Sequence, residues 1–117
     1  MILRIVLCIF SKINVIQVDV SLLFTIIEKN FLNFSEEEQK VFFKSLSEVA
    51  SVLKKIFHAD KINYAIYGDL VSHFHVHIVP KKKDGPEWGI PFTDTKEKIY
   101  LTDEEYQSRI KLIKSSL

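Results

Sequence analysis

Two regions of the chain have the apolar patterning of β-strands. In the N-terminal region, runs rich in isoleucine, valine and phenylalanine predict three strands, at Ile2 to Phe10, Asn14 to Val18 and Ser21 to Glu28. β-Branched and aromatic side chains favour an extended backbone because they pack well on a pleated surface. Further along, the same pattern predicts two strands joined by a turn at Gly68-Asp69. These two strands are Ile62 to Tyr67 and His73 to Val79.

Two other segments have the pattern of amphipathic helices, each with a start signal. Ser35 and Glu38 match a capping box, in which the serine oxygen accepts from the third amide and the glutamate reaches back. Thr102 and Glu105 match a second one. An apolar stripe at three- and four-residue spacing follows the first start, formed by Phe42, Leu46, Val49, Leu53 and Ile56. The inner face of the second helix is predicted at Tyr106, Ile110 and Ile113.

The order of these elements predicts an α+β fold. The succession β-β-β-α-β-β-α, with short connections, favours an antiparallel sheet backed by helices. The chain has 117 residues, of which 47% are hydrophobic and 26% are charged. This length and composition fit one compact domain over residues 1–117.

Charge and cysteine content exclude several classes of protein. Lys and Arg together number 16, and Asp and Glu together number 15, so the formal net charge is +1. This balance gives no global field toward DNA or an anionic membrane, and we expect neither nucleic acid nor membrane as a partner. The single cysteine, Cys8, cannot form an intramolecular disulfide, which favours the cytoplasm. Its apolar surroundings favour a buried, inert thiol.

The apolar N-terminus is similar to the hydrophobic region of a signal peptide. Arg4 interrupts the run Met1 to Phe10, however, polar residues follow at once, and no small-x-small cleavage site is present. No window approaches the roughly 18 apolar residues that a membrane-spanning helix needs. We therefore expect this segment to be part of the mature fold.

The chemistry of the chain is concentrated in one strand. Residues 73–79 read His-Phe-His-Val-His-Ile-Val. Because strand side chains alternate between faces, His73, His75 and His77 should share one face, each roughly 6.6 Å from the next along the strand. The apolar residues between them should anchor the other face. Three histidines in strict alternation are difficult to explain by packing alone, so this row is the candidate functional site.

A row of imidazoles suits chemistry at phosphorus. Imidazole has an unperturbed pKa of about 6.5, so it can attack as a neutral base, while a neighbouring imidazolium binds an anion or donates a proton. A phosphoryl centre requires charge neutralisation and in-line positioning, and the row supplies both. Lys81, Lys82 and Lys83 follow directly. We interpret them first as a solvated charge run and second as a group that attracts phosphate.

The sequence around this row resembles the histidine triad (HIT) family, whose signature is three histidines separated by hydrophobic residues. The resemblance rests on His73 to Val79, on Ile62-Asn63-Tyr64 and on Gly68-Asp69. The loop Lys81 to Gly89 is similar to that of a bacterial-type subgroup. The match covers Lys61 to Pro91 and extends over both helices, but from Met1 to Asn33 the chain departs from the family pattern, which implies a diverged or shortened N-terminal region.

The resemblance implies a HIT-like antiparallel sheet of about five strands with two helices. It also implies a nucleotide hydrolase or nucleotidyl transferase that acts at the α-phosphate, without a cofactor, on a purine nucleotide or nucleoside phosphoramidate, and commonly as a homodimer. By position, His75 would be the nucleophile, and His73 and His77 would hold the phosphate and manage the leaving-group proton. Asn63 would contact the phosphate region, and Trp88 would close the rim of the pocket.

Two departures from the family pattern keep a second hypothesis open. The family commonly has a further histidine upstream of the first helix, and this chain has no histidine before His58. Leu70 stands where related proteins often have a serine or threonine that contacts the phosphate. A nucleotide-binding or dimeric interaction module with weakened catalysis is therefore the alternative function.

A metal site is the third hypothesis. His-x-His on a strand does ligate zinc, and Asp69 is the nearest carboxylate. The three histidines span roughly 13 Å of one strand, however, which is too far for one common ion. We therefore predict no metal. We expect His58, in the last turn of the first helix, to act as a cap, because a protonated imidazole interacts favourably with the negative end of the helix dipole.

Overall fold

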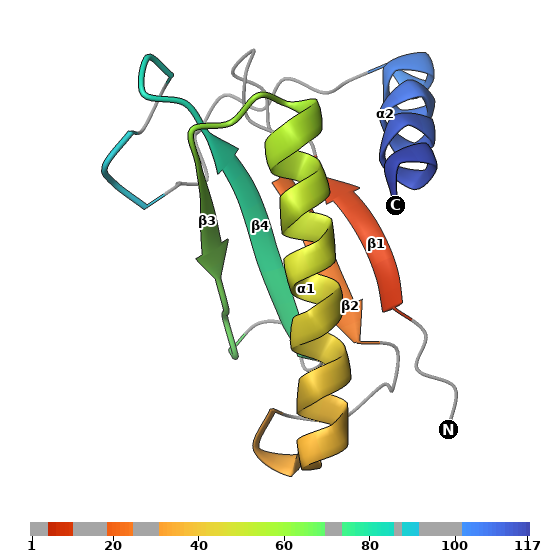
Figure 1. Cartoon of the computed structure of the whole chain (residues 1–117), viewed down its shortest axis with the longest axis vertical. Coiled ribbons are helices and arrows are strands. Elements are labelled where there is room, and N and C mark those ends of the chain that lie inside the picture. The colour runs from red at the N-terminus through yellow and green to blue at the C-terminus, as the bar shows by residue number, and fades with distance from the viewer. Residues whose placement is uncertain (1–4, 11–18, 25–30, 70–73, 86–87, 92–101) are drawn as a thin grey trace.

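The computed structural model describes residues 5–10, 19–24, 31–69, 74–85, 88–91 and 102–117. Its elements are four strands, one short 3-10 helix and two α-helices (Figure 1). In chain order they are β1 (Ile5–Phe10), β2 (Asp19–Phe24), η1 (Phe31–Asn33), α1 (Glu36–Ile56), β3 (Lys61–Ala65), β4 (His75–Lys81) and α2 (Asp103–Ser116). None of the helices in these ranges is long and apolar enough to cross a membrane.

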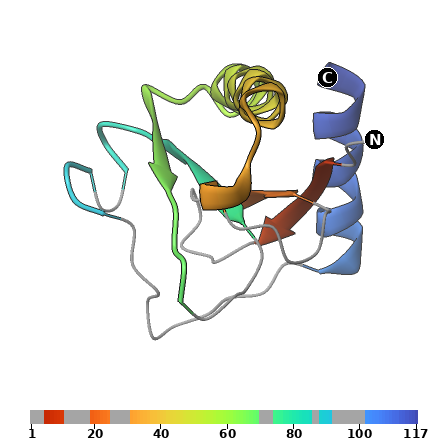
Figure 2. The ribbon, with the colours of Figure 1, turned by 90° about the horizontal axis from the view of Figure 1, so that it is seen from below.

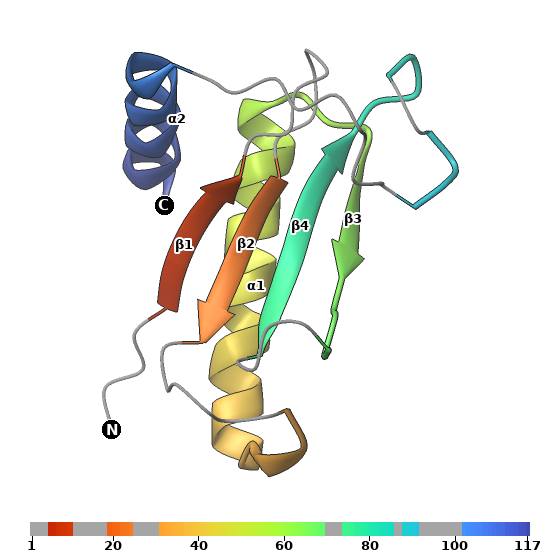
Figure 3. The ribbon, with the colours of Figure 1, turned by 180° about the vertical axis from the view of Figure 1, so that it is seen from behind.

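The four strands form one antiparallel sheet in the order β1-β2-β4-β3 (Figure 3). This arrangement confirms the predicted α+β class and the antiparallel sheet. The predicted strand at Asn14 to Val18 lies outside the described residues. The strand that carries the histidines, β4, is central, with β2 on one side and β3 on the other.

The end of β4 differs from the prediction. The sequence pattern placed it at Val79, but the strand continues through Pro80 to Lys81. The register between β2 and β4 runs only as far as Ile78, whereas β3 pairs with β4 up to Lys81. A proline is tolerated beyond the point where one neighbouring ladder ends, because the amide hydrogen that it lacks has no partner strand there.

The core lies between α1 and one face of the sheet (Figures 1 and 2). The predicted apolar stripe of α1 is confirmed, since Phe42, Leu46, Val49 and Leu53 are buried and Ile56 packs against them. Val76 and Ile78 of β4, and Phe74 directly before it, join the same cluster. The second helix, α2, lies beside the β1 edge and contributes the buried Ile113.

Both helices begin as their sequences predict. At α1, Ser35 Oγ accepts from the Glu38 amide and the Glu38 carboxylate accepts from the Ser35 amide, each at 3.1 Å. At α2, Thr102 and Glu105 form the same reciprocal pair. These boxes satisfy amide donors that have no partner inside a helix, so they fix where each helix starts.

The end of α1 corrects the prediction for His58. The helix ends at Ile56, so His58 lies beyond its last turn, with a φ of 51°. Its amide donates to the Lys55 carbonyl at 3.4 Å, and the Ala59 amide donates to the Lys54 carbonyl at 3.0 Å. This is the Schellman pattern, in which a left-handed residue ends the helix. The cap is therefore made by the backbone of His58.

Candidate functional site

The histidines belong to the face of β4 that points away from α1. Phe74, Val76 and Ile78 face the core, so alternation places His75 and His77 on the opposite face. In the sheet register, His77 stands opposite Ser21 of β2 and Ala65 of β3. Because strands on both sides hold β4, the backbone that carries these two imidazoles is fixed.

The structure brings two of the three predicted catalytic histidines together. The rings of His75 and His77 have centroids 5.2 Å apart and planes at 79°, an edge-to-face arrangement. His75 is only 6% exposed, and His77 is half-buried. His73 lies outside the described residues, so its predicted role stays a prediction.

Tyr67 is part of this site, although the sequence did not single it out. Its ring meets that of His77 edge to face, with centroids 5.7 Å apart. Tyr67 lies just beyond the end of β3, and half of its side chain is exposed. Such a contact fixes the orientation of an imidazole by shape and by the ring quadrupole. The only sequence signal for it was the position of an aromatic residue before the Gly68 turn.

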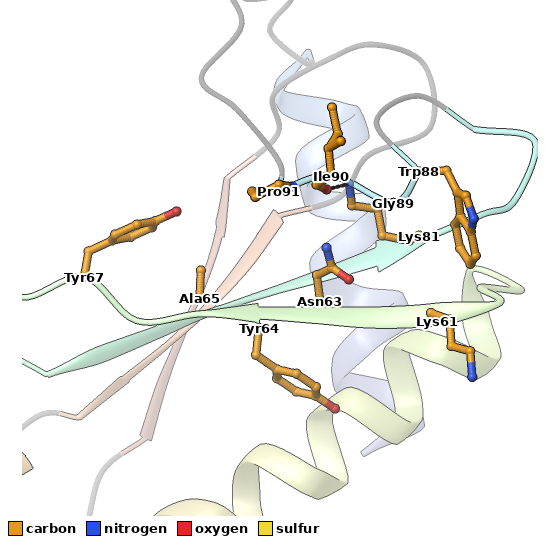
Figure 4. A pocket seen from close by; sticks show the side chains of 10 residues that line it. All are labelled: Lys61, Asn63, Tyr64, Ala65, Tyr67, Lys81, Trp88, Gly89, Ile90 and Pro91. Atoms are coloured by element: carbon orange, nitrogen blue, oxygen red, sulfur yellow. Dashed lines mark hydrogen bonds between the residues drawn. The ribbon is translucent and has the colours of Figure 1, made fainter.

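A cavity of about 480 Å³ follows β3, and neither His75 nor His77 is among the described residues that line it (Figure 4). The two predicted substrate-binding residues, Asn63 and Trp88, both line it. At one end, its wall includes Ala65, which stands opposite His77, and Tyr67, which contacts His77. The cavity therefore extends from the immediate surroundings of His77.

The structure corrects the interpretation of Lys81. The sequence pattern indicated first a run of three solvated lysines, but Lys81 is only 3% exposed. Its Nζ donates to the Ile90 carbonyl at 3.3 Å, and it lines the cavity (Figure 4). Of its neighbours, Lys82 is half-buried and Lys83 is exposed. The cause is the longer β4, which places Lys81 on the histidine face.

Of the residues considered for a metal, His73 lies outside the described residues and Asp69 is exposed at the end of the turn. Leu70, which stands at the predicted phosphate-contact position, also lies outside the described residues. Within the described ranges, there is no group of three or more His, Cys, Asp or Glu side chains placed to hold one ion.

Comparison with known proteins identifies the class to which this fold and site belong. The HIT domain matches residues 26–84, which is half of the chain. An uncharacterized HIT-like protein of Mycoplasma genitalium is 33% identical in an alignment of 89 positions, which covers 68% of this chain and 61% of that protein. The chain belongs to the HIT family, as its histidine row predicted. It spans about three fifths of the length of this relative.

Solved structures show the same fold. A histidine triad protein of Bradyrhizobium japonicum superposes with a TM-score of 0.83 at 21% identity, over 96% of this chain and 83% of that one. A hypothetical histidine triad nucleotide-binding protein of Sulfolobus tokodaii has a TM-score of 0.65 at 23% identity, over 84% of this chain and 68% of that one. At these identities the likeness supports the architecture alone.

Proposed function

We propose that this HIT protein transfers or hydrolyses nucleotidyl groups at the α-phosphate through a covalent intermediate on His75. The observation that carries the proposal is the pair of imidazoles on the central strand, 5.2 Å apart, beside a cavity large enough for a small ligand. Covalent catalysis uses a nucleophile with a general acid or base beside it, and His75 and His77 are two imidazoles side by side.

The proposed reaction consists of two displacements at the α-phosphorus. In the first, a neutral imidazole nitrogen of His75 attacks the α-phosphorus, the bond from phosphorus to the leaving group breaks, and the leaving group takes its electron pair and a proton. In the second, water attacks the nucleotidyl-imidazole, its proton passes to the imidazole that protonated the leaving group, the phosphorus–nitrogen bond breaks, and the nucleoside monophosphate leaves with the oxygen of that water. Both imidazoles are then restored.

The other residues would support these steps. We assign to His77 and His73 the binding of the phosphate oxygens and the transfer of the proton to the leaving group. Tyr67 would act through its contact with His77, as a positioning residue. Asn63 and Trp88, which line the cavity, would contact the substrate beyond the reacting phosphorus.

The substrate class follows from the family and from the site. We propose a purine nucleotide or a nucleoside phosphoramidate. The name of the Sulfolobus tokodaii protein, which includes nucleotide binding, supports a nucleotide as the ligand of this fold. The single cysteine of the chain fits a reducing compartment, and we place the reaction in the cytoplasm.

We also propose that the protein acts as a homodimer that forms along β3. In the described sheet, β3 is an edge strand, and an unpaired edge is a template for a second chain. Three large apolar side chains on β3 and directly after it are at least half exposed: Tyr64, Ile66 and Tyr67. Pairing of two copies at this edge would cover them.

Turnover of a fluorogenic adenosine phosphoramidate tests the proposal. The wild-type protein, freed of metal and assayed at neutral pH, should release the amine. The turnover rate of His75→Ala should be at least about a thousandfold lower. His58→Ala is the matched control, because His58 is an exposed histidine at the end of α1. Equal rates in the wild-type protein and His75→Ala would overturn the proposal.

A binding module without turnover is the second candidate. It is favoured by the absence of any histidine before His58 and by Leu70, which cannot donate a hydrogen bond to phosphate. Loss of such donors at a charged transition state costs roughly 10²–10³ in rate each. AMP binding that His75→Ala leaves unchanged, without turnover by either protein, would favour this function.

A further inference from the structure

The histidine row continues beyond its third member. His77, Val79 and Lys81 alternate with core-facing residues along β4, so Lys81 shares the face of His75 and His77. Lys81 lies four residues after His77, which is roughly 13 Å along the strand. The positively charged side chain of Lys81 therefore lies beyond His77 on the same face, on the side away from His75.

The cavity connects these two positions. In the register of β3 and β4, Ala65 stands opposite His77 and Lys61 stands opposite Lys81, and both β3 residues line the cavity. The cavity thus runs along β3 from the surroundings of His77 to those of Lys81 (Figure 4). Its described lining contains two lysines and no acidic side chain. A ligand group at this far end meets positive charge.

We propose that Lys81 is a specificity-determining residue that selects substrates whose leaving group carries a negative charge, as a phosphate or a carboxylate. This inference rests on the proposed function. With the α-phosphorus at His75 and His77, the leaving group extends along the cavity toward Lys81. Lys81 is only 3% exposed, so water screens its ammonium group less than that of a solvated lysine, and its attraction for an anion is correspondingly stronger.

The contact of Lys81 with Ile90 also gives this lysine a structural role, which an experiment has to distinguish from selection of an anionic leaving group. Through this hydrogen bond, Lys81 holds residues 88–91 at the cavity wall. Lys81→Met keeps the apolar stem and removes the charge, and Lys81→Arg keeps the charge. Lys83→Met is the matched control, since it removes an exposed charge two residues further along. Thermal unfolding of each variant measures the structural effect separately.

The experiment compares substrates that differ only in the charge of the leaving group. Two adenosine phosphoramidates with leaving amines of equal length, one ending in a carboxylate and one in a neutral amide, are assayed beside diadenosine triphosphate. For the wild-type protein we expect kcat/KM to be about tenfold higher for the anionic than for the neutral amine, as one charged hydrogen bond provides. Lys81→Met should reduce this ratio to below about twofold, while Lys81→Arg and Lys83→Met retain it.

The outcomes separate the carboxylate from the phosphate. A preference for the carboxylate amine that Lys81→Met abolishes identifies a carboxylate ligand. A selective loss of diadenosine triphosphate turnover in Lys81→Met, with the neutral amide unchanged, identifies a phosphate. An equal change for all three substrates, or ratios that Lys81→Met leaves as in the wild type, would overturn the proposal and leave Lys81 as an anchor of residues 88–91.

Binding to His75→Ala distinguishes this failure from failure of the proposed function. Calorimetric titration with the same three compounds measures dissociation constants without turnover. If no protein turns over substrate but binding in the His75→Ala background still favours the anionic compounds, and the additional Lys81→Met change abolishes this preference, catalysis is refuted and the anion site stands. If turnover depends on His75 but neither rates nor binding depend on Lys81, the anion site is refuted and catalysis stands.

Discussion

The imidazole rings of His75 and His77 meet edge to face, with their centroids 5.2 Å apart and their planes at 79°. Two residues apart on a strand, they point to the same side by alternation, and β2 and β3 hold the strand between them. We propose that both rings act on one phosphoryl group. This relationship is the basis of the proposed chemistry.

Tyr67 should influence the rate through His77. Tyr67→Leu removes the edge-to-face contact, and we expect turnover to fall by about threefold to tenfold, the value of one aromatic pair. Tyr67→Phe keeps the ring and should retain most of the activity. Tyr106→Leu is the control, because Tyr106 lies on α2 and is not among the described residues that line the cavity. Equal losses of turnover in Tyr67→Leu and Tyr106→Leu would contradict a positioning role.

Glycine in place of His58 should stabilise the folded protein. Its φ of 51° is unfavourable for a residue with a Cβ atom and is accessible to glycine at no steric cost. We expect His58→Gly to raise the free energy of unfolding by about 0.5–1 kcal/mol, because the strain relieved exceeds the added entropy of the unfolded chain. Urea unfolding measures the change. His58→Val should lower stability, and the opposite order of the two variants would exclude the backbone cap.

The helix–sheet core should respond strongly to a cavity in α1. Leu53 is fully buried in the cluster with the apolar residues of β4, so Leu53→Ala should lower the free energy of unfolding by about 2–5 kcal/mol. Leu112→Ala in α2 is the matched control, since that leucine is largely exposed, and its effect should stay within about 0.5 kcal/mol. Similar losses in both variants, by urea unfolding, would place the core elsewhere.

The β3 edge should control association. Ile66, one residue beyond β3, is 56% exposed, and burial of its side chain between two copies would favour a dimer. We expect Ile66→Lys to shift the protein toward monomer in sedimentation experiments. Leu112→Lys, at an exposed position on α2, should leave the association state unchanged. A wild-type protein that sediments as a monomer at all concentrations would refute this interface.

Local signals in the sequence predicted much of this fold. The capping boxes at Ser35 and Thr102 and the apolar stripe of α1 depend on residues within one or two turns, and the structure has them as expected. The shared face of His75 and His77 followed from the period of two in a strand. Such features need no knowledge of distant partners.

Features that depend on distant partners were missed or misplaced. The length of β4 is decided by its pairing with β3, which extends the ladder to the pair Lys61 and Lys81. The burial of Lys81 then depends on Ile90, nine residues further along, and the contact between Tyr67 and His77 crosses the turn between the strands. No local sequence pattern specifies these contacts, because each depends on the register of the sheet and on the path of a loop.

The covalent intermediate on His75 is the central claim, and its direct measurement is the mass of the protein during turnover. The wild-type protein is mixed with an adenosine phosphoramidate, quenched within the first turnover in alkaline denaturant, which preserves a phosphorus–imidazole bond, and analysed by mass spectrometry. We predict the added mass of one adenylyl group, mapped to His75, in the wild-type protein and in His58→Ala, and none in His75→Ala. An adduct on another residue, turnover that persists in His75→Ala, or the absence of both adduct and turnover would contradict the account.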